Sequence, residues 1–129
     1  MKIRLIVSSL ALGAVLLHSS PALSHHSNVA YEVTKVITIT GVVTEWQWVN
    51  PHTWLHLTVD DDKGGKVEWK VEGRAPGVLL RAGWTKSSLK PGEKVTVDCS
   101  PAKDGTHTGI IARVTKADGT ILGNQMAPQ

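Results

Sequence analysis

The stretch VITITGVVTEWQWVNPHTWLHLTVD, residues 36–60, decides the fold. Branched apolar residues alternate with threonine in its first part, and leucine and valine alternate with polar or aromatic residues in its second part. Side chains two apart on a strand share a face, so the pattern predicts half-buried strands over 36–49 and 52–60. Asn50-Pro51 predicts the turn between them. Gly41, isolated within the first strand, indicates a bulge or a sharp bend.

The rest of the chain continues this β pattern with one interruption. The stretch VLLRA followed by Gly83 predicts one or two helical turns over 78–82. Further strands are expected over 66–72, 93–100 and 110–117. Three strands, a short helix and two strands is the order of an OB-fold, an all-β, five-stranded Greek-key barrel. A β-sandwich is the alternative, but it needs about seven strands.

The length of 129 residues suits one compact domain. We expect four segments along the chain. They are a signal peptide at 1–24, an extended lead-in at 25–35, the OB-like barrel at 36–120 and a tail at 121–129.

The signal peptide is predicted from a basic start and a short apolar run. Lys2 and Arg4 precede an uncharged apolar run over 5–17, which is shorter than the roughly 20 residues that span a bilayer. Cleavage is expected after Ala22 or after Ser24. The protein would then be periplasmic or secreted, with no stable membrane anchor. A membrane anchor or a buried N-terminal helix is the alternative.

Net charge bears on the possible binding partners, and the cysteine content bears on disulfide bonds. The full chain carries a formal charge of +3, and removal of 1–24 leaves 12 basic and 11 acidic residues. Without a basic cluster on an exported protein, we expect no nucleic-acid partner. Cys99 is the only cysteine, so it forms no internal disulfide, and its position in step with Val95 and Val97 predicts a buried small hydrophobe.

The adjacent histidines His25 and His26 are the leading metal-ligand candidates. Cleavage after Ser24 would offer the α-amino group and imidazole of His25 to one ion, an arrangement that suits copper. Cleavage after Ala22 would make His25 the third residue, which also gives a square-planar copper site. The alternative is that both histidines are only a polar start to the mature chain.

His52 is the expected third ligand, because it begins a strand beside the proline turn. His56 lies four residues further on, about 13 Å away on a straight strand, so the two cannot chelate one ion by themselves. The nine residues 27–35 can span up to about 30 Å, which lets His25 reach His52. No H-E-x-x-H or C-x-x-C pattern is present, so a hydrolytic zinc site is not indicated.

The outward face of strands 2 and 3 is a second candidate site, because OB-folds bind ligands there. We assign Asn50, Trp54, His56 and His107 to this face, with an ordinary solvated sheet surface as the alternative. Glu68 and Glu72 on the next strand are interpreted as serving solubility. Trp46 and Trp48 share a face and are expected to pack over one end of the barrel.

Several motifs resemble a family of small exported bacterial proteins known only as a domain of unknown function. They are HHS at 25–27, WVNPH at 48–52, GWT at 83–85 and SLKPG at 88–92. The resemblance implies export and a small β domain, and no established activity. It places His25, His26 and His52 at signature positions.

These observations favour an exported periplasmic protein that binds a metal ion, with copper preferred, for metal handling or delivery. The alternative is a non-metal OB module that binds a small ligand, a sugar or a periplasmic partner protein through the face around Trp54. No nucleophile–base or paired-acid constellation is recognised, so an enzyme is not expected.

Overall fold

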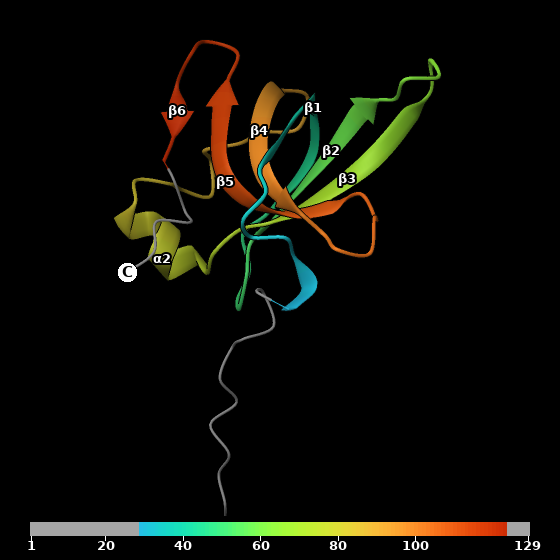
Figure 1. Cartoon of the computed structure of the whole chain (residues 1–129). Coiled ribbons are helices and arrows are strands. Elements are labelled where there is room, and N and C mark those ends of the chain that lie inside the picture. The colour runs from blue at the N-terminus through green and yellow to red at the C-terminus, as the bar shows by residue number, and fades with distance from the viewer. Residues whose placement is uncertain (1–28, 124–129) are drawn as a thin grey trace, which may run out of the picture.

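The computed structural model describes residues 29–123, which form a small β-barrel with one short helix at its end (Figure 1). Strand and helix positions follow the predicted order closely. The elements are β1 (Ile37–Gln47), β2 (Trp54–Asp60), β3 (Lys66–Glu72), α2 (Pro76–Arg81), β4 (Lys94–Pro101), β5 (Thr108–Lys116) and β6 (Ile121–Leu122).

The strands form one sheet in the order β3-β2-β1-β4-β5-β6, and these neighbours are antiparallel. A parallel pairing of β3 with β5, through 70–72 and 108–110, closes the first five strands into a barrel. This is the OB-fold plan, so the predicted fold class is confirmed.

The alternating pattern of the strands builds the core. Leu55 and Leu57 of β2, Val71 of β3 and Val97 of β4 are fully buried, as their inward positions predict. Cys99 is also fully buried, and burial raises the pKa of its thiol to about 12. The expectation of a buried small hydrophobe at this position is therefore confirmed.

Gly41 marks the point at which β1 is shared between two neighbours, since it pairs with Val59 of β2 and Val95 of β4. A Cβ atom there would lie 2.6 Å from the carbonyl oxygen of Thr58. Glycine thus permits a close approach of β1 and β2. The register irregularity between β1 and β2 lies between Val43 and Glu45, so the suggestion of a bulge at Gly41 itself is corrected.

Tryptophans close one end of the barrel. Trp84 follows α2 and Gly83 and is fully buried, with its ring centroid 5.8 Å from that of Trp46. The ring centroid of Trp48 also lies 5.8 Å from that of Trp46. Trp46 and Trp48 therefore pack at a barrel end, as predicted.

Two segments that the sequence pattern places outside the barrel, the lead-in and the tail, contribute to the folded domain. Tyr31, in the expected lead-in, is only 7% exposed and forms an isolated bridge with Ala102. Residues 121–122, in the expected tail, form β6 after a turn in which Asp118 accepts a hydrogen bond from the Thr120 amide.

The predicted signal peptide lies outside the described residues. Within 29–123, no helix has the length and apolar character needed to cross a membrane.

Candidate functional site

The candidate site lies on the outer face of the barrel, where β2 begins and β3 ends. The ring nitrogen Nδ1 of His52 is 2.7 Å from Oε1 of Glu72, the last residue of β3. The hydroxyl of Tyr31 donates a 3.0 Å hydrogen bond to Oε2 of the same carboxylate. Antiparallel pairing explains the first contact, because Glu72 is opposite Trp54 and His52 lies two residues before it.

Tyr31 reaches this site because backbone hydrogen bonds hold its segment against the end of β4 and the loop that follows it. The amide of Glu32 donates to the carbonyl of Pro101, and the amide of Lys103 donates to the carbonyl of Ala30. Burial of the ring, helped by its bond to Glu72, raises the pKa of Tyr31 above its ordinary value. The hydroxyl therefore stays protonated and acts as a donor at neutral pH.

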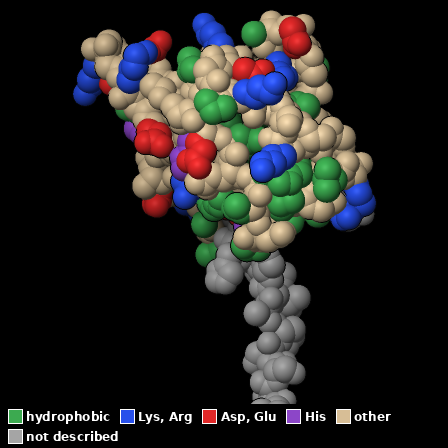
Figure 2. Space-filling view, turned by 180° about the vertical axis from the view of Figure 1, so that it is seen from behind, with side chains coloured by type: hydrophobic (Ala, Val, Ile, Leu, Met, Phe, Trp, Pro, Cys, Tyr) green, Lys and Arg blue, Asp and Glu red, His purple; other side chains and the backbone are tan. Residues whose placement is uncertain are grey.

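His56 forms a second histidine–carboxylate pair, but its other nitrogen is closed off. Its Nδ1 is 3.2 Å from Oε1 of Glu68, while its Nε2 is buried with no hydrogen-bond partner. In the space-filling view, histidine atoms emerge in small areas beside acidic side chains (Figure 2). A nitrogen that neither solvent nor a donor reaches is poorly suited to bind an ion from solution.

The aromatic part of the predicted ligand face is already engaged by its neighbours. The ammonium of Lys70 lies 4.3 Å from the centroid of the Trp54 ring, a cation–π contact. His107 instead lies against Trp69, with ring centroids 5.2 Å apart. Asn50 is exposed in the turn before β2.

The structure does not bring the predicted metal ligands together within the described residues. His25 and His26 lie outside 29–123. Within that range, no group of three or more His, Cys, Asp and Glu side chains could hold a metal ion. His52, His56 and His107 therefore do not form one ligand set, and 29–123 offers His52 as a single oriented imidazole.

Three residues of this region were assigned other roles or none by the sequence. The sequence pattern assigns Glu68 and Glu72 only to solubility, but Glu68 hydrogen-bonds His56 of β2, and Glu72 lies 2.7 Å from Nδ1 of His52, just before β2. Their proximity could have been predicted from the sequence, because both histidines and both glutamates fall on outward positions of adjacent strands. Tyr31 carried no such signal, since its segment has no hydrophobic period.

The fold and this network define a small OB-type barrel with a histidine–carboxylate–tyrosine cluster on its outer face. The sequence profile of a family of unknown function, DUF6152, matches residues 14–113, and the chain belongs to that family. The resemblance to a family of unknown function is thereby confirmed. No curated protein matches the chain.

Among solved structures, the mitochondrial single-stranded DNA binding protein Rim1 from S. cerevisiae is similar. The identity is 13%, the TM-score is 0.48, and the match covers 70% of this chain and 96% of that one.

This finding corrects the expectation about partners. Charge and export predict no nucleic-acid partner, but a similar solved structure is that of a single-stranded DNA binding protein, so this prediction is not supported. At 13% identity and a TM-score of 0.48, this likeness assigns no nucleic-acid ligand to the chain.

Proposed function

We propose that this protein is an exported, periplasmic metal-binding protein, with copper as the favoured ion, that acts in metal handling or delivery. His25, His26 and His52 supply the ligands. The described residues offer one imidazole in an oriented position, so the remaining ligands come from the histidine pair near the N-terminus.

The observation that carries the proposal is the 2.7 Å contact between Nδ1 of His52 and Glu72. Histidines that bind metals commonly donate their other ring N–H to a carboxylate, which fixes the tautomer and the ring orientation. With Nδ1 engaged, Nε2 is the nitrogen left for an ion. No residue within 29–123 hydrogen-bonds that atom, and the His52 side chain is 37% exposed.

Tyr31 supports the proposal through its place in the chain. Its hydroxyl shares Glu72 with His52, so residue 31 is fastened beside the imidazole. His26 precedes Tyr31 by five residues, and five residues span at most about 18 Å. The chain length is therefore sufficient for His25 and His26 to reach His52.

The chemistry of the three histidines suits copper. Imidazole nitrogen is a borderline ligand that is largely unprotonated near neutral pH. Cleavage after Ser24 would add the α-amino group of His25, and nitrogen-rich sets of this kind favour Cu(II) over hard cations. An oxygen-preferring ion such as calcium would find few ligands here.

A competition titration tests the proposal. The full chain, expressed with export and recovered after processing, is titrated with Cu(II) against a chelator of known affinity. We expect the double variant His25→Ala/His26→Ala to bind more than about 100-fold more weakly, because direct ligands contribute more than the residues that orient them. His107→Ala is the matched control and should bind as the parent does, since His107 lies over Trp69. Unchanged affinity in the double variant would overturn the proposal.

A further inference from the structure

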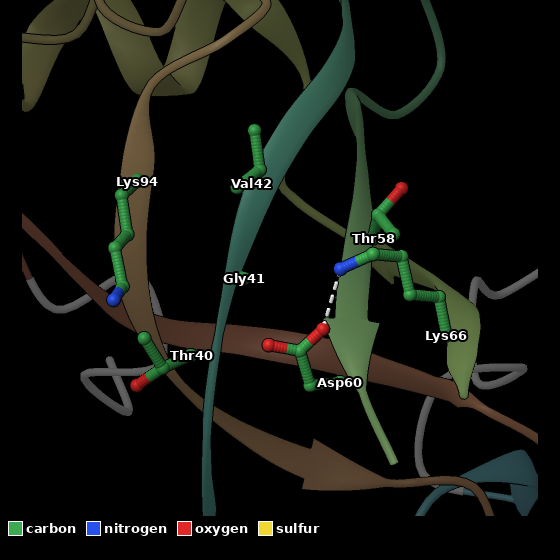
Figure 3. A pocket seen from close by; sticks show the side chains of 7 residues that line it. All are labelled: Thr40, Gly41, Val42, Thr58, Asp60, Lys66 and Lys94. Carbon is green, nitrogen blue, oxygen red and sulfur yellow. Dashed lines mark hydrogen bonds and ion pairs between the residues drawn. The ribbon is translucent and has the colours of Figure 1, made fainter. Parts of the chain in front are cut away.

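A hollow on the outer face of the barrel lies at the other end of β2 from His52. This open hollow has a volume of about 400 Å³. Figure 3 shows the side chains that line it. Asp60, which lines it, is eight residues from His52, about 26 Å along an extended strand. The hollow is therefore separate from the proposed metal site. Its lining residues are Thr40, Gly41, Val42, Thr58, Asp60, Lys66 and Lys94.

Four strands contribute to the hollow, and β1 runs through its middle. Lys94 of β4 pairs with Val42 of β1, and Lys66 of β3 pairs with Asp60 of β2. The close-up shows Lys94 on one side of β1, with Asp60 and Lys66 on the other (Figure 3). Three strand spacings separate the backbones of β4 and β3, about 14 Å in a flat sheet. In the close-up the ammonium of Lys66 points to Asp60, whereas the Lys94 side chain runs along β4, and its flexible stem lets it turn toward a ligand (Figure 3).

The charges of the hollow are unequal. Lys66 and Asp60 form an ion pair of 2.6 Å, whereas Lys94 makes no hydrogen bond or ion pair with any residue in 29–123. Two lysines and one carboxylate leave a net charge of +1 on the lining residues. The Lys66–Asp60 pair is highly exposed, at 69% and 81%, so it contributes little to stability and can be shared with a ligand.

The remaining walls suit a compact polar molecule. Thr40 and Thr58 contribute hydroxyl groups, which can donate or accept hydrogen bonds. The methyl groups of Val42, a residue that is 41% exposed, offer an apolar contact between the two lysines. The volume falls within the range of small-molecule sites.

We propose that this hollow binds a small organic polycarboxylate, with Lys94 and Lys66 each receiving one carboxylate group. Two cations on opposite walls match a molecule with separated negative groups better than an anion with a single charged centre. Within 29–123, Lys94 forms no ion pair, whereas Lys66 is paired with Asp60, so Lys94 is the more available of the two cations. Asp60 limits the affinity, since its charge opposes that of the ligand.

The test is a titration of the ¹⁵N-labelled full chain with citrate, followed by amide chemical shifts at low ionic strength. We expect saturable shifts at Gly41, Thr58 and Lys94, and much weaker changes with acetate. Lys94→Gln should weaken citrate binding about two- to fivefold, the scale of one exposed charge pair. Asp60→Asn should strengthen it, because a repulsive charge is removed.

Lys86→Gln is the matched control, since Lys86 is exposed and does not line the hollow. It should change the affinity less than Lys94→Gln does. The proposal is overturned if citrate gives no saturable shifts at these amides, if acetate binds there equally well, or if both lysine variants lose the same affinity. The last outcome would indicate general charge attraction. Neither variant touches the histidines, so the result is independent of copper binding.

Discussion

The carboxylate of Glu72 interacts with two side chains, Tyr31 and His52, that come from distant parts of the chain. It accepts from Tyr31, which is 41 residues earlier in the sequence, and it contacts His52 across the β2–β3 pairing. Its side chain is only 12% exposed, so these partners replace most of its water. At the residue scale, the proposed function therefore depends on Glu72 as the group that orients His52.

Glu72→Gln should weaken copper binding about 10- to 100-fold, the range seen when a residue that orients a metal ligand is replaced. Glutamine keeps the shape and can still accept a hydrogen bond, but it is a weaker partner for the imidazole N–H. The competition titration measures the change. Glu68→Gln is the matched control, because Glu68 pairs with His56 and is 70% exposed. Equal losses in both variants would contradict the assignment of Glu72.

The limits of the sequence pattern are also visible at this scale. The outward positions of His52, His56, Glu68 and Glu72 were predictable from period-two alternation, and the structure confirms that they share one face. Their pairing depends on which residues of β2 and β3 are opposite each other. That register is set by the turn between the strands and by core packing, which alternation alone does not fix.

At the scale of elements, Gly41 decides how β1 passes between β2 and β4. A substituted Cβ would meet the Thr58 carbonyl oxygen at 2.6 Å and Cγ2 of Val59 at 2.9 Å. The first contact is with backbone, which cannot move aside as a flexible side chain can. The close approach of β1 to β2 therefore depends on the absence of a side chain at Gly41.

Gly41→Ala should lower the free energy of unfolding by about 1–3 kcal/mol, the usual cost of overpacking. Gly77→Ala is the control, because a Cβ at that helical position meets no atom within 4 Å. It should leave stability unchanged or raise it by up to about 1 kcal/mol, since alanine favours helices. Urea unfolding of both variants measures the difference, and equal effects would show that the close approach at Gly41 costs nothing.

Asp98 connects three strands on the outer face. It accepts a 2.6 Å hydrogen bond from Thr38 of β1, and Arg113 of β5 donates to it at 2.6 and 2.9 Å. The bond from Thr38, together with the bonds and charge of Arg113, holds the pKa of Asp98 below its ordinary value of 3.8. The ionised carboxylate therefore stabilises the fold above that pH, and the contribution is lost as pH falls through the lowered pKa.

Asp98→Asn should accordingly destabilise the protein more at neutral pH than at about pH 3, where the parent begins to lose the same contribution. Urea unfolding of parent and variant at both pH values measures the difference. Asp62→Asn, an exposed turn residue, is the control. A difference between parent and Asp98→Asn that stays constant with pH would contradict the role given to the carboxylate.

At the scale of the whole molecule, closure of the barrel end by Trp84 holds the fold together without a disulfide. Trp84 is fully buried against Trp46, and its amide bonds the carbonyl of Leu79 in α2. Trp84→Ala should cost about 3–5 kcal/mol, a large share of the stability of a small domain. Trp54→Ala, on the outer face, should cost much less. Comparable losses in urea unfolding would show that the barrel end is not the critical part of the core.

Most of the architecture was predictable because each strand carries its own alternation and each break carries a turn residue. Tyr31 and β6 were not, because both depend on contacts with distant segments. Tyr31 is buried through Ala102 and Glu72, and β6 has two residues, too few to show a period. His25 and His26 lie outside the described residues, so their role as ligands stays a prediction.

In the proposed function, these two histidines and His52 hold one metal ion. Native mass spectrometry of the protein recovered from the periplasm, before and after one equivalent of Cu(II), tests it most directly. The mass also gives the true N-terminus. We predict a chain that begins at His25 or Leu23 and retains one copper ion against mild competition, and a His25→Ala/His26→Ala variant that retains none. A processed parent chain that retains no copper would show that the three histidines are not a copper site.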